Sequence, residues 1–209
     1  HGSGIIGARI FLITQKSLSP GEVTLAQLRL DEPQAMMVGD RLVLRDWSGE
    51  ATLGGGVILE AAASRKKIGS EEQIRFLRTR VSGLGDLSIL LESVIERDRL
   101  VDLTYETSRL KFSEQQVDAV VEAMLAAERI GEVSSYLCDV SWWESIIDRA
   151  CNLIGAYHKR NTDLPGLSLE DLRMDIIQRL PDPEIFDALI GCLKKRSVSQ
   201  HGTYLAEDS

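Results

Sequence analysis

A run of three glycines, Gly54, Gly55 and Gly56, is the first feature of the sequence that could do chemistry, because glycine-rich loops cradle phosphate groups. A phosphate-binding loop of the Walker type ends in Gly-Lys followed by Ser or Thr, so that the lysine reaches the phosphates. Here Gly56 is followed by Val57 and Ile58. The run therefore indicates a turn that leads into an apolar strand, and we predict no nucleotide site there.

Histidine and cysteine supply many metal ligands and nucleophiles, but here they are poorly spaced for either task. His158 falls inside a predicted helix, and Cys151 precedes it by seven residues, about two helical turns. We interpret His158 as a capping or packing residue near a helix end. Cys151 and Cys192 lie on or beside apolar helical faces, which favours core cysteines over activated thiolates. We therefore expect no catalytic residue, no metal site and no cofactor in this chain.

Three short clusters of positive charge could contact the phosphates of a nucleic acid. The last of them lies where a predicted third helix meets a hairpin, a place at which winged-helix domains commonly touch nucleic acid. For each cluster the alternative is a solvated surface. The candidate nucleic-acid-binding residues are Arg65, Lys66 and Lys67, then Lys159 and Arg160, and finally Lys194, Lys195 and Arg196.

The composition is that of a globular chain with room for more than one small domain. Its 209 residues are 44% hydrophobic and 27% charged, with a formal net charge of −8. Nucleic-acid contact must therefore come from a local patch that works against the overall field. No run approaches the roughly 18 apolar residues of a membrane span, and the sequence shows no signal peptide. Three scattered cysteines without a C-x-x-C pair fit a reducing cytoplasm.

The elements that position these residues begin with a β segment over 1–62. Short apolar or alternating stretches at 5–13, 23–30 and 40–45 are separated by turn residues. Leu42 and Leu44 would share one face of a strand. The pattern is that of an incomplete antiparallel β-barrel, and the strands need partners that we expect before residue 1.

After a hinge over 61–70 the apolar period becomes helical, and the segment 63–140 reads as a winged-helix domain. Ser113 with Gln116 forms the signature of a capping box. A short helix over 104–110 and a hairpin over 129–139 complete the helix, helix, helix, hairpin order. The two long helices carry apolar stripes at Leu87, Leu90, Leu91, Val94 and Ile95, and at Val117, Val120, Val121, Met124 and Leu125.

The same plan repeats over 141–209. Ser141 with Glu144 reads as a capping box, and Asp182 as an N-cap ahead of Pro183. A constant offset of 68 residues aligns the last helix and hairpin of the two units. The aligned pairs are Val117 with Ile185, Val121 with Leu189, Leu125 with Leu193, Ile130 with Val198, Tyr136 with Tyr204, and Leu137 with Leu205. The repeat predicts two tandem winged-helix domains behind the β segment, in an α+β chain.

Several of these stretches resemble a known family. Most of the β segment is similar to the third domain of translational GTPases, and the glycine run resembles the selenocysteine-specific branch, SelB. The winged segment around 157–173 is similar to that family's second winged-helix domain. The stretches that carry the resemblance are Pro20-Gly21-Glu22, Gln27-Leu28-Arg29-Leu30, 39–46, 52–57, Tyr157-His158-Lys159-Arg160-Asn161, Leu164-Pro165-Gly166-Leu167 and Leu172-Arg173.

The resemblance implies a parent factor that delivers selenocysteyl-tRNA to the ribosome at UGA codons. It implies that GTP and Mg²⁺ are held in a GTPase domain outside this chain, and that distal winged helices bind a hairpin in the message. This chain would be a non-catalytic spacer and RNA- or tRNA-contacting arm in a cytoplasmic factor, and we expect a monomer with no membrane contact. Arg65, Lys66 and Lys67 could reach the tRNA or solubilise the linker.

Two other functions remain open on the sequence. Tandem winged helices also form DNA-binding regulators, because a fold does not determine a function. The β segment and the acidic balance argue against that class. A protein-binding scaffold is the other alternative, and titration with tRNA, ribosomes and duplex DNA would separate the three.

Overall fold

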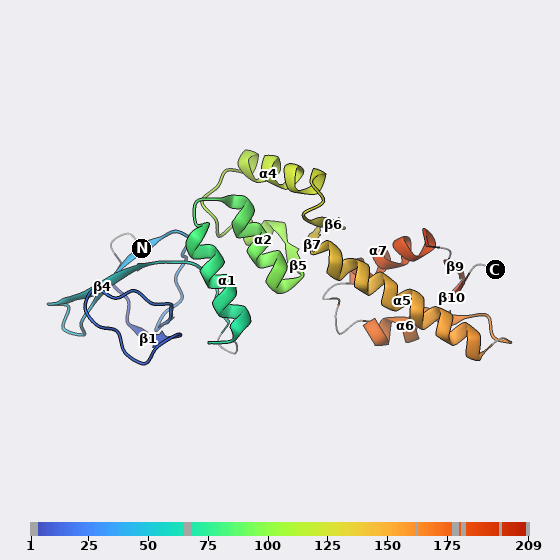
Figure 1. The fold of residues 1–209 in the computed structure, drawn as a ribbon, viewed down its shortest axis with the longest axis horizontal. Helices are drawn as coiled ribbons and strands as arrows, with labels where there is room; N and C mark the ends of the chain where they lie inside the picture. Colours follow the sequence, from blue (N-terminus) through green and yellow to red (C-terminus); the bar gives the residue numbers. More distant parts are fainter. Residues whose placement is uncertain are drawn as a thin grey trace. The chain divides into compact units, whose positions relative to one another are not determined.

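The computed structural model of the chain describes residues 4–64, 68–161, 163–176, 180, 183–196 and 198–207. The chain divides into two compact units, residues 1–126 and 127–209. Figure 1 shows strands β1 to β5 and helices α1 to α4 in the first unit, and the remaining strands and helices in the second. The three-domain division predicted from the sequence stays a prediction.

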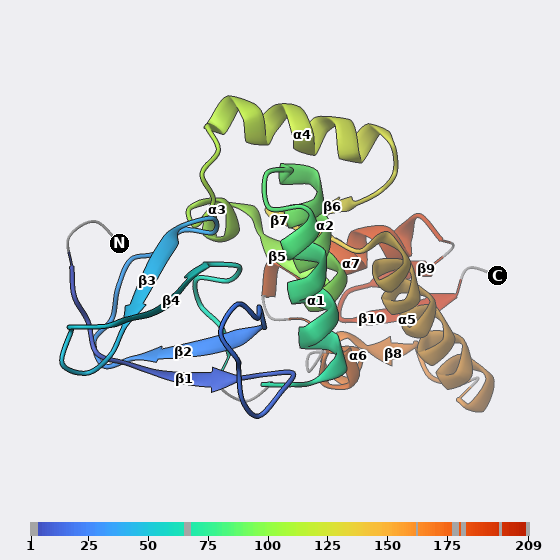
Figure 2. The ribbon, with the colours of Figure 1, turned by 60° about the vertical axis from the view of Figure 1, so that its left-hand side comes forward.

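Four strands form the β module of the first unit, β1 (Ala8–Leu12), β2 (Ala26–Leu30), β3 (Arg41–Arg45) and β4 (Thr52–Val57). They pair as two antiparallel ladders, β1 with β2 and β3 with β4. The two ladders stand apart in Figure 2, and they do not join into a closed sheet. The predicted incomplete antiparallel β-barrel is therefore confirmed as an open, barrel-like arrangement.

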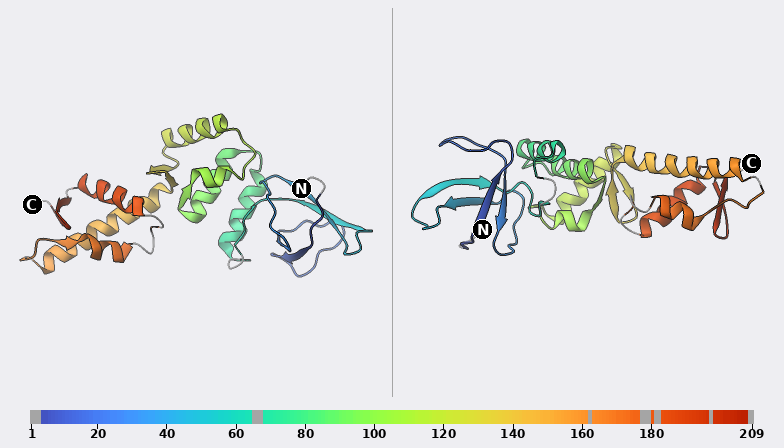
Figure 3. Two further views of the ribbon diagram at one scale, coloured as in Figure 1. Left: turned by 180° about the vertical axis from the view of Figure 1, so that it is seen from behind. Right: turned by 90° about the horizontal axis from the view of Figure 1, so that it is seen from below.

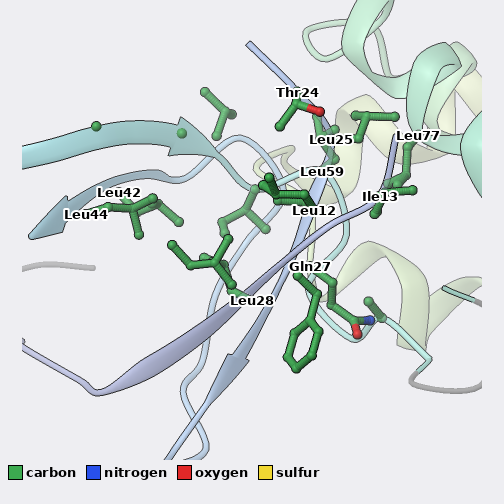
Figure 4. Close-up of a pocket in the computed structure, with 18 of the residues that line it drawn as sticks. Leu12, Ile13, Thr24, Leu25, Gln27, Leu28, Leu42, Leu44, Leu59 and Leu77 are labelled. Carbon is green, nitrogen blue, oxygen red and sulfur yellow. The ribbon is translucent and has the colours of Figure 1, made fainter. Parts of the chain in front are cut away.

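Between the two ladders lies an open groove of about 2340 Å³. Leucines line this groove, because successive side chains of a strand point to opposite faces and the leucines share the inner one. Figure 4 shows Leu12 and Leu28 on the side of the β1–β2 ladder that faces Leu42 and Leu44. Leu42 and Leu44 are half-buried while Val43 between them is exposed, as the sequence pattern predicts.

The glycine run lies inside strand β4 rather than in a turn. Gly54, Gly55 and Gly56 pair with Leu44, Val43 and Leu42. A Cβ atom on Gly55 would approach the carbonyl oxygen of Leu42 to 3.1 Å, so the close approach of the two backbones favours glycine there. The predicted turn lies earlier, over 46–51, and the prediction was wrong about its position.

The helices of the first unit are α1 (Glu71–Ser82), α2 (Leu87–Asp98), α3 (Leu103–Thr107) and α4 (Glu114–Ala126), with strand β5 (Leu100–Asp102) before α3. All five residues of the predicted α2 stripe are buried. The capping box of α4 is confirmed, since the Gln116 amide donates to Ser113 Oγ at 3.4 Å and the Ser113 amide donates to Gln116 Oε1 at 2.9 Å.

Helix α1 is not among the helices predicted from the sequence, and its buried face is partly polar. Its buried residues are Gln73, Phe76, Leu77 and Arg80, so half of its inward face is polar. Periodicity of apolar residues cannot reveal such a face, because the polar side chains become buried only through partners on other elements.

The second unit contains β6 (Gly131–Val133), β7 (Tyr136–Cys138), α5 (Val140–Arg160), β8 (Leu167–Ser168), α6 (Leu169–Ile176), α7 (Pro183–Lys194), β9 (Val198–His201) and β10 (Tyr204–Glu207). The last hairpin and β8 form a sheet of order β8-β10-β9. Figure 3 shows α6 and α7 lying along the long helix α5. Three helices and a hairpin wing are the winged-helix plan that the sequence predicts.

The internal repeat is visible in the burial of equivalent positions. Val117 and Ile185 are buried on α4 and α7, and Leu137 and Leu205 are buried on the following hairpins. Each equivalent tyrosine, Tyr136 or Tyr204, is the first residue of its strand. These equivalent positions therefore serve the same packing role in both copies of the repeat.

Helix α5 begins two residues earlier than the predicted capping box requires. Asp139 is its N-cap, and the Asp139 carboxylate accepts from the Trp142 amide at 2.8 Å. Ser141 lies inside the first turn, so the predicted box with Glu144 is wrong. The predicted N-cap Asp182 lies outside the described residues, while Pro183 does open α7.

Candidate nucleic-acid interface

The tip of the β3–β4 hairpin carries Trp47, whose side chain is 96% exposed. Asp46 builds the turn that holds it there. Its carboxylate accepts from the Ser48 hydroxyl at 2.7 Å and from the Ala51 amide at 3.0 Å. The same two donors hold the pKa of Asp46 below its ordinary value, so the carboxylate stays charged in its accepting role.

The outer face of this hairpin adds cationic and apolar side chains. Arg41, Val43 and Arg45 alternate along β3, and all three are exposed. Leu53 on β4 is 66% exposed, at the point where the ladder register shifts. An exposed indole beside guanidinium groups is the combination that stacks on bases and binds phosphates. Sequence reasoning missed this site, although a tryptophan inside a turn is a recognisable signal.

The predicted cluster at the end of α7 is partly engaged within the second unit. Lys194 ends α7, and the side chains of Lys194 and Lys195 are exposed. Arg196 donates to Asp148 Oδ1 at 2.8 Å and is also hydrogen-bonded to Glu144. Its bond to Glu144 and the nearby carboxylate charge raise the pKa of Arg196. The structure thus leaves Lys194 and Lys195 to solvent and pairs Arg196 with α5.

The other predicted site residues are dispersed. Lys159 and Arg160 are exposed in the last turn of α5. Arg65, Lys66 and Lys67 lie outside the described residues. None of these assignments is tested by the fold, and all eight residues stay predictions as nucleic-acid contacts.

The exposed faces of the two third helices are not cationic. On α4, Glu114, Asp118 and Glu122 recur every four residues and are exposed. On α7, Glu184 and Asp187 are exposed toward its start. A recognition helix that enters a groove of nucleic acid approaches phosphates on both sides, and carboxylates on its outer face oppose that approach.

A buried arginine connects the β module to the helices of the first unit. Arg80 on α1 is 1% exposed. Its guanidinium donates to the carbonyl oxygen of Leu59, just after β4, at 2.9 Å and to Ser93 Oγ on α2 at 3.1 Å. It also donates to Glu106 Oε1 on α3 at 2.8 Å. One side chain thus bonds to the segment after β4 and to two helices besides its own.

A second arginine reinforces the same joint. Arg97 on α2 lies over the ring of Phe76, 3.9 Å from its centroid, and pairs with Glu60 at 2.7 Å. Glu60 also accepts from Gln73 Nε2 on α1 at 2.8 Å. Burial disfavours the charged guanidinium, but the ion pairs with Asp98 and Glu60 outweigh it and raise the pKa of Arg97.

The connection between β2 and β3 provides a third tie to the helices. Asp40, which is 7% exposed, pairs with Lys111 Nζ at 2.6 Å. The Val38 amide donates to the carbonyl oxygen of Arg109 at 2.9 Å. The Lys111 ammonium, with the Met37 amide, lowers the pKa of Asp40. The β module and the helices of this unit are therefore joined at several independent points.

The described residues hold no cluster of three or more His, Cys, Asp or Glu side chains that could bind a metal ion. Cys138, Cys151 and Cys192 form no disulfide bond. In the part of the chain that the structure describes, no helix is long and apolar enough to cross a membrane.

Comparison with known protein families matches two separate parts of the chain. Residues 1–65 match the family of the β-barrel domain of selenocysteine-specific elongation factor, and residues 151–206 match the winged-helix family of elongation factor SelB. The chain is 23% identical over 187 residues to the selenocysteine-specific elongation factor of Desulfomicrobium baculatum, covering 82% of this chain and 27% of that protein. It is 21% identical over 170 residues to the selenocysteine-specific elongation factor of Haemophilus influenzae, covering 80% of this chain and 26% of that protein.

A solved structure shows the same fold. The crystal structure of a bacterial selenocysteine-specific elongation factor, EF-Sec, superposes with a TM-score of 0.59 at 13% identity, over 98% of this chain and 30% of that one. The chain thus spans about a quarter of the length of the curated relatives it matches.

An open β-barrel domain and a winged-helix domain, each matched to a factor of protein synthesis, place the chain among the translation elongation factors. Within that class it belongs to the SelB family of selenocysteine-specific elongation factors. The resemblance seen in the sequence is confirmed.

Proposed function

We propose that this chain is a non-catalytic arm of a factor that delivers selenocysteyl-tRNA to the ribosome at UGA codons. It would separate a GTPase body from distal domains that bind a hairpin in the message. The observation that carries this proposal is the joint formed by Arg80, Arg97 and Glu60, which fastens the β module to the helices of the first unit. A spacer needs such a joint, because a loosely linked module transmits no position.

The chain itself would perform no chemistry. GTP and Mg²⁺ would bind in the GTPase body of the whole factor, and the arm would work in the cytoplasm as a monomer. The test is an assay of phosphate release from GTP by the purified chain. We expect no release above the buffer control, and release that copurifies with the chain through several columns would contradict the proposal.

The arm would also contact RNA, and the β3–β4 hairpin is the best-supported place. Its exposed Trp47 offers stacking, and Arg45, two residues before it, offers positive charge. The carboxylates on the outer faces of α4 and α7 make groove binding by these helices less favourable. Lys194 and Lys195 remain candidate phosphate contacts of the second unit.

Tryptophan fluorescence gives a direct test of the hairpin. The chain has three tryptophans, so Trp142→Phe with Trp143→Phe leaves Trp47 as the reporter. We expect a selenocysteine tRNA transcript to quench this emission. Trp47→Ala should weaken binding about tenfold, because stacking of one base contributes about 1–3 kcal/mol, whereas Trp47→Phe should retain most of the affinity.

The double variant Lys194→Glu, Lys195→Glu tests whether the second unit contributes to tRNA affinity in the same titration. Glu114→Lys tests the effect of a charge change on the outer face of α4. Equal affinity of Trp47→Ala and the parent chain for tRNA would remove the hairpin from the interface. Tight, sequence-selective binding to duplex DNA at moderate salt would instead favour a DNA-binding regulator.

A further inference from the structure

Two arginines lie directly opposite each other on the β1–β2 ladder. The antiparallel register pairs Arg9 with Arg29, and Phe11 with Gln27. These four side chains share one face of the ladder, because residues two apart on a strand point the same way. Leu12 and Leu28 belong to the other face, which lines the groove, and Figure 4 shows Gln27 directed away from them.

Like charges that face each other across a strand pair destabilise a sheet unless something neutralises them. Within the described part of the chain, the side chains of Arg9 and Arg29 form neither an ion pair nor a hydrogen bond. Asp31, the next acidic residue on this face, lies against Gly7 and pairs with neither arginine. No carboxylate among the described residues thus pairs with either guanidinium group.

Arg29 is held in place although it has no polar partner. Its guanidinium carbon lies 4.1 Å from the centroid of the Phe11 ring, which orients the guanidinium plane. Its Nε and the Oε1 atom of Gln27 are the buried side-chain polar atoms left without a hydrogen-bond partner among the described residues. Gln27 is 8% exposed. Buried polar groups are rarely left unsatisfied, and such exceptions cluster where a ligand or water completes the structure.

Further positive charge follows this face in the sequence. Gln27 Nε2 donates to the carbonyl oxygen of Ser64 at 3.3 Å, which anchors that segment to the ladder. The next three residues of the chain are Arg65, Lys66 and Lys67.

We propose that Arg9 and Arg29 form a binding site for a single phosphate group of an RNA backbone. Directly opposite residues of an antiparallel pair have Cα atoms about 5 Å apart, so both guanidinium groups can donate to one tetrahedral anion. The anion supplies the negative charge that the ladder lacks. This inference rests on the proposed RNA-binding function, and it adds a phosphate contact on a different strand pair from Trp47.

The test uses the full chain and three variants, Arg9→Gln, Arg29→Gln and the double variant, titrated with a selenocysteine tRNA transcript at several salt concentrations. Losing one phosphate contact should lower the slope of log affinity against log salt by about one. We expect the double variant to show that change and a loss of about tenfold or more in affinity at low salt. The matched control is Arg75→Gln, since Arg75 is an exposed arginine already paired with Glu96.

Inorganic phosphate separates the anion site from the rest of the RNA surface. It should raise the melting temperature of the parent chain by about 2 °C or more, and that of the double variant much less. Without added anion, Arg9→Gln should melt above the parent chain at low salt, because it removes the opposed charges.

The outcomes are separable. If Arg9→Gln and Arg29→Gln bind tRNA as the parent does while Trp47→Ala does not, the phosphate site is wrong and the RNA-binding function stands. If phosphate stabilises the parent chain but tRNA does not bind, the RNA source of the anion is wrong. If neither ligand has an effect, both proposals fall.

Discussion

Several charged or reactive side chains of this molecule are buried and have a structural role. Arg80 and Asp40 are charged, yet both are buried and both hold separate elements together. Cys138 is a potential nucleophile, but it lies in the core of the second unit with 1% exposure. Burial, and not residue type alone, therefore determines whether such a side chain can react.

Cys138 gives a prediction with a pH dependence. Burial, with the nearby Asp139 charge, raises the pKa of Cys138 to about 11. The thiolate is the reactive form, so at pH 8 only about one thiol in a thousand is ionised. In a Cys151→Ser, Cys192→Ser variant, alkylation of the native chain should be far slower than in urea and should quicken as the pH rises towards 11. Equal rates in the native and unfolded chain, measured by mass spectrometry, would contradict the buried thiol.

Two residues could act as the N-cap of α5, and the choice between them sets the residue at which the helix begins. Asp139 and Ser141 are both favoured N-cap residues, and the structure uses Asp139. The helix thereby gains two residues, and the Glu144 side chain bonds to Arg196, which follows α7 in the sequence.

Two alanine substitutions distinguish these caps. Asp139→Ala should lower the free energy of unfolding of the second unit by about 1 kcal/mol, because the Trp142 amide loses its acceptor. Ser141→Ala should change it by less than about 0.5 kcal/mol, as expected of a residue inside the first turn. Urea denaturation followed by circular dichroism measures both. A larger loss for Ser141→Ala would restore the capping box with Glu144.

On the scale of the whole molecule, the main observation is that the β module and the helices of the first unit share a polar joint. Each tie joins residues far apart in the sequence, such as Glu60 with Arg97 and Asp40 with Lys111. Buried ion pairs are weak as sources of net stability, but removing one partner is costly. The joint therefore specifies one arrangement of the two parts, which is what a spacer requires.

Arg80→Met tests the joint. It leaves Glu106 and the carbonyl oxygen of Leu59 without their donor, and we expect a loss of about 3 kcal/mol in the free energy of unfolding of the first unit. Amide hydrogen exchange around Leu59 and Glu60 should accelerate. Arg75→Met, which breaks the exposed pair with Glu96, should cost less than about 1 kcal/mol. Unchanged exchange near Leu59 in Arg80→Met would show that Arg80 does not couple the two parts.

Local periodicity and turn chemistry were sufficient for most of the elements. The apolar stripe of α2 and the capping box of α4 are properties of nearby side chains, and both appear in the fold as predicted. The motifs around Gly54 and Pro165 likewise sufficed for the family.

Only the tertiary structure decided which polar side chains are buried and which charges are paired. Arg196 reads as a free cation in the sequence, but it meets Glu144 and Asp148, which lie 52 and 48 residues away. The buried face of helix α1 includes Arg80 and Gln73, whose partners Leu59 and Glu60 lie on another segment. Arg9 and Arg29 become a pair only through the register of β1 with β2. Apolar burial follows from a short repeating pattern, whereas the partner of a charge is fixed by contacts between distant segments, which no local pattern encodes.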